Sequence, residues 1–572
     1  MRWKVAEKAR KDASMNILLC STNAKYIHSS LAVRYLFAAV RKSCPDQIRV
    51  EVLEFTINQP LEMVLHEINE KKPDVIAFSC YIWNISFIRE LIRRIAEKLP
   101  GIPIILGGPE VSYNPEEILA LNPVVDYIIM GEGEVPFPKL LNRLQDGKDA
   151  SDIAGLYFRN NNGGVTCNKA KKPLPEPPSP YTPEYFQALE GRIAYLETSR
   201  GCPYSCAFCL SGINGCSVRF FDMERAKKEL VLLANSGTQT VKLVDRTFNC
   251  NPRRAYELFQ FIIENAGREI PDGVCFHFEV AADIFDNQTL DLLASAPAGL
   301  IQLEAGLQSF NAETLEAVNR KTDLEKLEKS IHILLKNQNI HLHIDLIAGL
   351  PYENLESFME SFDRAYFLSP HMLQLGFLKM LHGSDLRKKA DDLGYIYSKE
   401  PPYEVIRTPW LSEEDLLTLR QAEYALQRLY NSGRFSIALN YIIRAAAMRP
   451  FSLFAGLGAY LRDNAPMSLD DFTKAAFDYF TGLPGIHPGG LRDAMVCDRI
   501  ASGIKIPGFL KIPDEGFKRT LNHIRKSYFQ EQKGVKINAA ILYEGGKRAV
   551  FADGPKSPVT GRHTLQTIPM DE

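Results

Sequence analysis

Short apolar runs alternate with amphipathic segments over two long stretches of this chain, and this alternation is what most constrains its fold. In residues 15–148 the runs predicted as strands are NILLCST (16–22), VEVLEF (50–55), DVIAFSC (74–80), IPIILGG (102–108) and VDYIIMG (125–131). Segments 30–42 and 85–99, which lie between strands, place apolar residues at helical spacing. Strands with near-continuous apolar runs, separated by helices, predict a parallel sheet that is covered on both faces.

The alternation resumes at Ile193. The runs predicted as strands there are IAYLETS (193–199), TVKLVD (240–245), VCFHFEV (274–280), LIQLEAGL (300–307), HLHIDLIAGL (341–350) and MLQLGFL (372–378). Helical patterns separate them; one begins at Asp222 and ends at Gly237. Six βα units on a right-handed path predict a partial, open version of the (β/α) barrel.

The predicted fold class is therefore α/β: a doubly wound, flavodoxin-like sheet, then a (β/α)6 partial TIM barrel, then a mainly helical C-terminal domain. The predicted parts are an extension (1–14), the doubly wound domain (15–148), a linker (149–190), the barrel (191–402) and the C-terminal domain of unknown role (403–572). The ligand of a doubly wound sheet is expected at the carboxyl ends of its strands.

Smaller features lie in the linker and the C-terminal part. Hairpins are predicted around Asn162-Gly163-Gly164 and over 539–553, where Gly545-Gly546 form the turn. Ser412 and Gly433 bound a strong helix, and the aromatic-rich stretch 451–461 is predicted to be core.

Bulk composition excludes several classes of protein. The chain has 572 residues, too many for one hydrophobic core, and a formal net charge of −2 from 67 basic and 69 acidic residues. That balance gives no reason to expect nucleic acid or an anionic membrane as a partner. No apolar run reaches the roughly 18 residues of a membrane span, and residues 1–14 lack the apolar run of a secretory signal. Eleven scattered cysteines then predict a reducing, cytoplasmic location.

Three of the cysteines form one tight motif, SRGCPYSCAFCLSG (199–212), after the first barrel strand. Cys202, Cys206 and Cys209 can converge only if this loop wraps around one centre, and soft thiolates select zinc or an iron–sulfur cluster. Structural zinc usually needs a fourth ligand, yet no second pair follows, and Cys216 lies seven residues on in a different phase. A four-iron, four-sulfur cluster with one open iron fits three cysteines best.

This motif resembles the signature of the radical S-adenosylmethionine superfamily, in which an aromatic residue precedes the last cysteine; here it is Phe208. The resemblance covers roughly residues 190–400. It implies that the open iron chelates S-adenosylmethionine and that the reduced cluster cleaves it to methionine and a 5′-deoxyadenosyl radical. Cys202, Cys206 and Cys209 are then the metal ligands and the catalytic residues.

The resemblance also implies cofactor contacts at the ends of the barrel strands. Glu279 would bind the ribose hydroxyls or the methionine ammonium group. Gln308 and Ser309 match the family's backbone-contact motif, and Gly349 and Leu350 match its adenine-contacting motif. Each of these residues could instead simply pack at the end of its strand.

Glycine-rich turns follow two strands of the first domain, GGPE (107–110) and GEGE (131–134). Paired glycines let a flat, bulky ligand approach the backbone. With the cysteine motif downstream, these turns resemble those of the cobalamin-binding radical S-adenosylmethionine proteins. The resemblance implies cobalamin contacts at Gly107, Gly108, Glu110, Gly131 and Glu132.

The sequence departs from these families at two places. The corrinoid motif Asp-x-His-x-x-Gly is absent, and His28, the one nearby histidine, is more simply a helix cap than a cobalt ligand. The family's Gly-Gly-Glu after the second barrel strand is replaced by LVDRTFN, in which Asp245 and Arg246 could form a structural ion pair.

The leading hypothesis is a cobalamin-dependent radical enzyme, most simply a methyltransferase acting on an unactivated carbon; ring formation by the same machinery is an alternative. Its partners would be a small-molecule or peptide substrate and an electron donor such as flavodoxin or ferredoxin. A second hypothesis is a methylthiotransferase, in which Cys20, Cys44 and Cys80 would hold another cluster. A third is a non-catalytic corrinoid or redox sensor.

Overall fold

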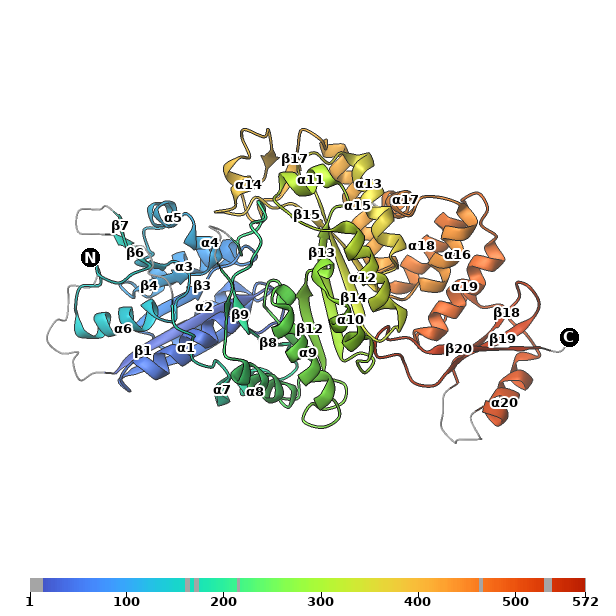
Figure 1. Cartoon of the computed structure of the whole chain (residues 1–572), viewed down its shortest axis with the longest axis horizontal. Coiled ribbons are helices and arrows are strands. Elements are labelled where there is room, and N and C mark those ends of the chain that lie inside the picture. Colours follow the sequence, from blue (N-terminus) through green and yellow to red (C-terminus); the bar gives the residue numbers. More distant parts are fainter. Residues whose placement is uncertain are drawn as a thin grey trace.

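The computed structural model describes residues 14–159, 165–168, 174–212, 217–461, 467–528 and 537–570, so Cys216 and residues 1–13 lie outside the described part. Three regions follow one another along the long axis of the molecule (Figure 1): the first α/β domain, the barrel and the helical C-terminal region. Among the described residues, every helix is too short or too polar to span a membrane.

The first sheet has seven strands in the order β2-β1-β3-β4-β5-β6-β7. They are β1 (Met15–Asn23), β2 (Ile48–Thr56), β3 (Val75–Ser79), β4 (Ile104–Gly107), β5 (Tyr127–Ile129), β6 (Leu156–Arg159) and β7 (Val165–Cys167). The first five pair in parallel, and the order 2-1-3-4-5 confirms the flavodoxin-like prediction. The hairpin β6–β7 adds two antiparallel strands beside β5, so part of the segment predicted as a linker extends this sheet.

Helices cover both faces of this sheet, as the near-continuous apolar runs of its central strands predict. On one face α1 (Leu31–Ser43) and α6 (Pro136–Asp146) pack against Ile17, Leu19, Ala77 and Ile105. The other face carries α2 (Leu61–Glu70), α3 (Ile85–Lys98) and α5 (Pro115–Leu121), while the single turn α4 (Pro109–Ser112) follows β4.

The barrel sheet has six parallel strands in the order β15-β14-β13-β12-β11-β8. They are β8 (Ala194–Leu196), β11 (Thr240–Leu243), β12 (Cys275–Val280), β13 (Ile301–Gln308), β14 (His341–Ala348) and β15 (Met372–Phe377). The connecting helices include α8 (Met223–Ala234), α9 (Pro252–Asn265), α10 (Asn287–Ala294), α12 (Leu324–Lys336) and α13 (Leu355–Phe367). The six-unit partial barrel is confirmed, and Asp222 caps α8 by accepting a hydrogen bond from the Arg225 amide, as the sequence predicts.

The C-terminal region contains α15 (Glu413–Leu429), α16 (Ser436–Ala446), α17 (Pro450–Tyr460), α18 (Leu469–Thr481), α19 (Pro488–Ala501) and α20 (Phe517–Tyr528). A sheet of β18 (Ala539–Leu542), β19 (Arg548–Asp553) and β20 (Thr564–Pro569) ends it, and the predicted hairpin is confirmed in β18–β19. Helix α17 packs on α13, with Phe451 and Phe454 against Phe362, so this region and the barrel share one core.

The C-terminal region also covers an edge of the barrel sheet. Helix α15 packs on β15, the strand at one end of the sheet order. The Asn431 side chain accepts a hydrogen bond from the Leu373 amide (3.0 Å) and donates one to the Leu373 carbonyl (2.8 Å). These bonds satisfy backbone groups that an edge strand would otherwise leave unpaired.

Candidate functional site

A cavity of about 780 Å³ lies where the carboxyl end of the first sheet meets the mouth of the barrel. The first domain contributes residues that follow β1, β3, β4 and β5, and the barrel contributes residues at the ends of β8 and β11. A ligand in this cavity would therefore contact both domains at once.

One arm of the cavity extends along a face of the first sheet. Leu19 and Ala77 line it from the strands, and Val33, Leu36 and Phe137 line it from α1 and α6. This arm is apolar and lies between the sheet and its helices. Its apolar lining fits the nucleotide tail of a corrinoid.

The glycines after β4 and β5 line the cavity, but they differ in what they can tolerate. Gly108 has a φ of +109°, and a Cβ built on it would lie 2.5 Å from the Cys80 carbonyl oxygen. Gly131 has a φ of +75° with open space around it, and Gly107 has an ordinary backbone whose Cβ would meet only the Ile129 oxygen, at 3.7 Å. Gly108 is thus required by the fold itself, whereas a side chain at Gly107 would point into the cavity.

The GEGE turn connects the first domain to the base of the cysteine loop. Glu132 accepts hydrogen bonds from Arg200 and Arg219 at 2.6 Å each, and Glu134 pairs with Arg200 at 2.5 Å. Arg200 also pairs with Glu197 (2.9 Å). Burial raises the pKa of Glu132, but the two guanidinium groups outweigh it and hold that pKa below its usual range.

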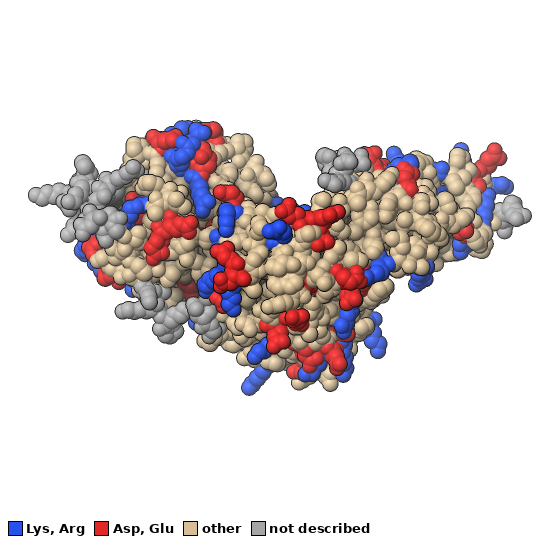
Figure 2. All heavy atoms as spheres, turned by 90° about the horizontal axis from the view of Figure 1, so that it is seen from above, with Lys and Arg blue, Asp and Glu red and all other residues tan. Residues whose placement is uncertain are grey.

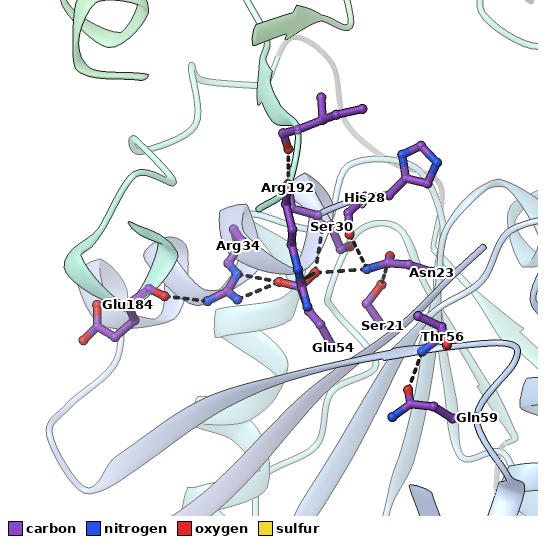
Figure 3. Close-up of polar contacts among 12 residues, drawn as sticks. Ser21, Asn23, His28, Ser30, Arg34, Glu54, Thr56, Gln59, Glu184 and Arg192 are labelled. Atoms are coloured by element: carbon purple, nitrogen blue, oxygen red, sulfur yellow. Dashed lines mark hydrogen bonds and ion pairs between the residues drawn. The ribbon is translucent and has the colours of Figure 1, made fainter. Parts of the chain in front are cut away.

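A second ionic contact fixes the loop between β1 and α1 (Figure 3). Glu54, with a side chain only 4% exposed, binds Arg34 (2.6 Å) and Arg192 (3.2 Å). It also accepts hydrogen bonds from the Ser30 amide (3.0 Å) and the Asn23 side chain (3.1 Å). Because Arg192 lies just before β8, this carboxylate ties the loop to the barrel.

His28 lies in that loop and lines the cavity. Its Nδ1 is 2.7 Å from the hydroxyl of Tyr195 on β8, and burial lowers the pKa of the ring. The prediction that His28 caps the following helix is wrong, because Ser30 occupies the N-cap position. The backbone beside it pairs with the barrel, since the Ile193 amide donates to the Ile27 carbonyl (2.9 Å).

The cysteine loop begins at a short antiparallel pair, β9 (Ser199–Arg200) and β10 (Arg219–Phe220). Cys202 and Cys206 are buried, and Cys209 is half-buried. Burial raises the pKa of Cys206, and the thiolates of Cys209 and Cys202 act in the same direction, so the three sulfurs are neighbours.

The spacing of these sulfurs distinguishes the two metals that the motif allows. Three thiolates on one tetrahedral zinc lie about 3.8 Å apart, because each Zn–S bond is about 2.3 Å long. Among the described His, Cys, Asp and Glu residues, the one group of three with ligand atoms within 4.8 Å of one another is Glu304, His343 and Asp345. The three cysteine sulfurs are not such a group, which is as expected for a cluster in which each sulfur binds a different iron.

Asp245 and Arg246 do not form the ion pair that their sequence positions allow. Asp245 is buried and accepts hydrogen bonds from the Thr198 amide (2.9 Å), the Thr198 hydroxyl (2.7 Å) and the Ser199 hydroxyl, which holds the start of the cysteine loop. Arg246 lines the cavity, and its guanidinium lies 3.8 Å from the carboxylate of Glu279.

The predicted contacts for S-adenosylmethionine lie at the carboxyl ends of the barrel strands. Burial raises the pKa of Glu279, which lies on β12 near Arg246. Gln308 has a φ of +74° and a buried side-chain oxygen without a hydrogen-bond partner. Ser309 donates its hydroxyl hydrogen to Glu353, so its backbone alone is free for a cofactor. Leu350 is fully buried beside Gly349, whose φ is +96°.

One residue expected at the cofactor makes another contact, and two residues that line the cavity were not anticipated. Glu110 is buried in α4 and accepts a hydrogen bond from Tyr403, and burial raises its pKa. Sequence reasoning missed Tyr195 and Arg200, which line the cavity from β8 and β9. The one feature of the sequence that could have indicated these two residues is their position, on either side of the end of the first barrel strand and just before the cysteines.

The cysteines considered for a second cluster lie on opposite faces of the first sheet. Cys20 and Cys80 are fully buried in the core under α2 and α3. Cys44, at the end of α1, packs against the core on the α1 and α6 face. These three thiols therefore cannot bind one cluster in this fold.

Three protein families match separate parts of the chain. The B12 binding domain matches residues 18–141, the Radical SAM superfamily matches residues 196–365, and a family of unknown function (DUF4080) matches residues 391–527. The first two matches cover the two α/β domains that form the cavity.

Two relatives are methyltransferases by name. The 2-(S-pantetheinyl)-carbapenam-3-carboxylate methyltransferase of Streptantibioticus cattleyicolor is 32% identical over 50% of this chain and 44% of that protein. The cobalamin-dependent radical SAM methyltransferase TokK of Streptomyces tokunonensis is 28% identical over 73% of this chain and 63% of TokK. The chain thus spans less than two thirds of the length of these curated relatives.

The fold is shared with a solved structure of the cobalamin-dependent S-adenosylmethionine radical enzyme OxsB. That likeness has a TM-score of 0.58, covers 91% of this chain and 81% of OxsB, and has 15% sequence identity. Fold and site together define a protein that joins a B12-binding domain to a radical SAM barrel. In this combination it is similar to cobalamin-dependent radical S-adenosylmethionine proteins such as TokK.

Proposed function

We propose that this chain is a cobalamin-dependent radical S-adenosylmethionine methyltransferase that methylates an unactivated carbon of a small-molecule or peptide substrate. The observation that carries this proposal is the shared cavity, whose walls include the glycine turns of the first domain and the base of the cysteine loop. Both relatives described above are methyltransferases by name, which supports methyl transfer.

Each cofactor has a matching set of residues in this arrangement. The apolar arm between the sheet and α1 and α6 would hold the corrinoid tail, and Cys202, Cys206 and Cys209 would hold the cluster. When bound, the cluster supplies the electron that cleaves S-adenosylmethionine, and cobalamin supplies the methyl group. Arg200 would keep the cysteine loop at a fixed position relative to the corrinoid domain, because it binds both Glu132 and Glu134.

Binding of S-adenosylmethionine is assigned to the strand ends that the sequence singled out. Glu279 would face the ribose or the ammonium group, and Gln308 offers its orphaned side-chain oxygen. Gly349 and the backbone of Ser309 would contact the cofactor without side chains, with Leu350 packed behind. Gly107, Gly108 and Gly131 would face the corrinoid. Glu110, through its hydrogen bond with Tyr403, and Glu132, through its ion pairs, would support that contact.

The methylthiotransferase hypothesis requires a second cluster in the first domain. The placement of Cys20 and Cys44 on opposite faces of the sheet disfavours it. A non-catalytic sensor has no need of an open iron in its cluster. A site of three cysteines leaves one iron open, which disfavours the sensor hypothesis as well.

We also propose a cytoplasmic location and an electron donor of the flavodoxin or ferredoxin class. The ten described cysteines are all free thiols, which supports a reducing compartment. Basic and acidic side chains are interspersed on the face shown in Figure 2, which supports the absence of a nucleic-acid partner.

The proposal is tested with anaerobically reconstituted protein, a strong reductant and S-adenosylmethionine. We expect formation of 5′-deoxyadenosine, and of a product heavier by one methyl group when candidate substrates are added. A protein that carries an intact cluster but forms no 5′-deoxyadenosine would contradict the proposal.

A further inference from the structure

The lumen of the barrel carries a group of charged side chains that the cavity and the cysteine loop do not use. Alternate residues of a strand face the same side, so the inward positions of β12, β13 and β14 share one surface. The strand register sets Glu279 beside Glu304 and Glu304 beside His343, with Asp345 two residues further along β14. These polar residues occupy positions where most barrels place apolar side chains.

His343 and Asp345 form a close pair in the barrel lumen. Their Nε2 and Oδ1 atoms are buried and lie 3.0 Å apart. The imidazole is only 6% exposed. The carboxylate of Glu304 lies near the other ring nitrogen, with Oε2 3.9 Å from Nδ1, so the imidazole has a carboxylate close to each of its nitrogens.

Glu304 completes a set of three possible ligands. One ligand atom of each of Glu304, His343 and Asp345 lies within 4.8 Å of the others, and no other such group occurs among the described residues. His277 contacts the Glu304 carboxylate through its Nε2 at 2.8 Å and so orients it. A supporting hydrogen bond of this kind is usual behind metal ligands.

We infer that Glu304, His343 and Asp345 form a binding site for a divalent cation of the Zn²⁺ class in the barrel lumen. One imidazole nitrogen and two carboxylates are ligands that such cations accept. Zn–N and Zn–O bonds are about 2.0–2.2 Å long, so one ion can reach two atoms that are 3.0 Å apart.

The site differs from the iron–sulfur centre in its ligands and in its place. Its ligands are nitrogen and oxygen atoms on β13 and β14, whereas the cysteines lie in the loop after β8. A cation here would have an open coordination position that can take an oxygen or nitrogen atom of the substrate. That role rests on the proposed function, whereas binding of the cation does not.

Lys242 gives the inference a second, independent test. Its ammonium group lies 3.2 Å from the Glu304 carboxylate and 3.9 Å from that of Glu279. This charge competes with a cation for Glu304. Lys242→Met should therefore tighten zinc binding, whereas in a simple ion-pair network the same change would create no zinc site.

The experiment is a zinc titration of the chelator-treated full-length protein with its cluster reconstituted, using a competing zinc dye and elemental analysis. We expect about one zinc per chain, at least tenfold weaker binding in Asp345→Asn and His343→Gln, and tighter binding in Lys242→Met. His332→Gln, which changes an exposed histidine of α12, should bind zinc as the wild type does.

Melting temperature and iron content, measured on each variant, separate loss of the site from loss of the fold. If one ligand variant fails to fold, Glu304→Gln replaces it. Absence of zinc from both the wild type and Lys242→Met, or wild-type affinity in the folded ligand variants, would overturn the inference. Cleavage of S-adenosylmethionine by the wild type, assayed separately, shows whether the proposed function holds.

Discussion

Replacing Gly107 with leucine tests where the corrinoid lies. Gly107 ends β4 and faces the same side as Ile105, toward α1, α6 and the apolar arm of the cavity. Its φ is not positive and a Cβ would meet nothing closer than 3.7 Å, so the variant should fold. Gly108 is unsuited to this test because its own Cβ would collide with the Cys80 backbone.

The size of the effect follows from the position of the strand. Gly107 pairs with Ser79 on one side and Ile129 on the other, so the backbone cannot retreat. The added side chain would then overlap the corrinoid tail in the apolar arm, and overpacking of this kind costs about 1–3 kcal/mol. We therefore expect a corrinoid affinity about 5- to 150-fold weaker than that of the wild type.

The assay is equilibrium dialysis of hydroxocobalamin, with iron content and melting temperature measured on the same samples. Gly508→Leu is the matched control, because it makes the same change in open space in the C-terminal region. Unchanged affinity in a folded Gly107→Leu protein would mean that the cobalamin lies elsewhere.

Three further results are expected. Replacing Cys202, Cys206 and Cys209 together with Ala should abolish both the visible iron–sulfur absorption and 5′-deoxyadenosine formation; turnover in that variant would exclude the cluster assignment. The reduced cobalt(II) protein should show no nitrogen hyperfine splitting from a lower ligand in electron paramagnetic resonance, because the sequence lacks the corrinoid motif Asp-x-His-x-x-Gly; splitting that disappears in His28→Ala would refute this. Arg200→Gln should lower the free energy of unfolding in urea by about 3 kcal/mol, since Glu134 and Glu197 lose their guanidinium partner and Glu132 keeps only Arg219; an unchanged midpoint would show that these ion pairs are dispensable.

The α/β architecture could be predicted because its signals are local. Apolar strands such as 74–80 and amphipathic helices such as 85–99 follow from periodicity alone, and the structure confirms both. The cysteine motif likewise lies within eight residues. The prediction that its sulfurs converge therefore did not depend on distant parts of the chain. Hairpin β6–β7 was predicted, but not its place in the first sheet. That place depends on pairing with β5, in which Ile129 and its partner Leu156 are 27 residues apart in the sequence.

Contacts between domains could not be predicted in the same way. The pairing of Arg200 with Glu132 and Glu134 joins residues that are 68 and 66 positions apart. His28 illustrates the same limit, since its position before a helix suggested a cap while its partner, Tyr195, lies 167 residues away. The cluster of Glu304, His343 and Asp345 was also missed, because adjacent parallel strands bring it together across a long crossover connection.

The most direct test of the whole account is the content of iron and corrinoid in one anaerobically reconstituted sample. The account predicts about four irons and about one cobalamin per chain, since one three-cysteine cluster and one corrinoid cavity are assigned. About eight irons per chain with no bound corrinoid would contradict it and indicate a second cluster in the first domain.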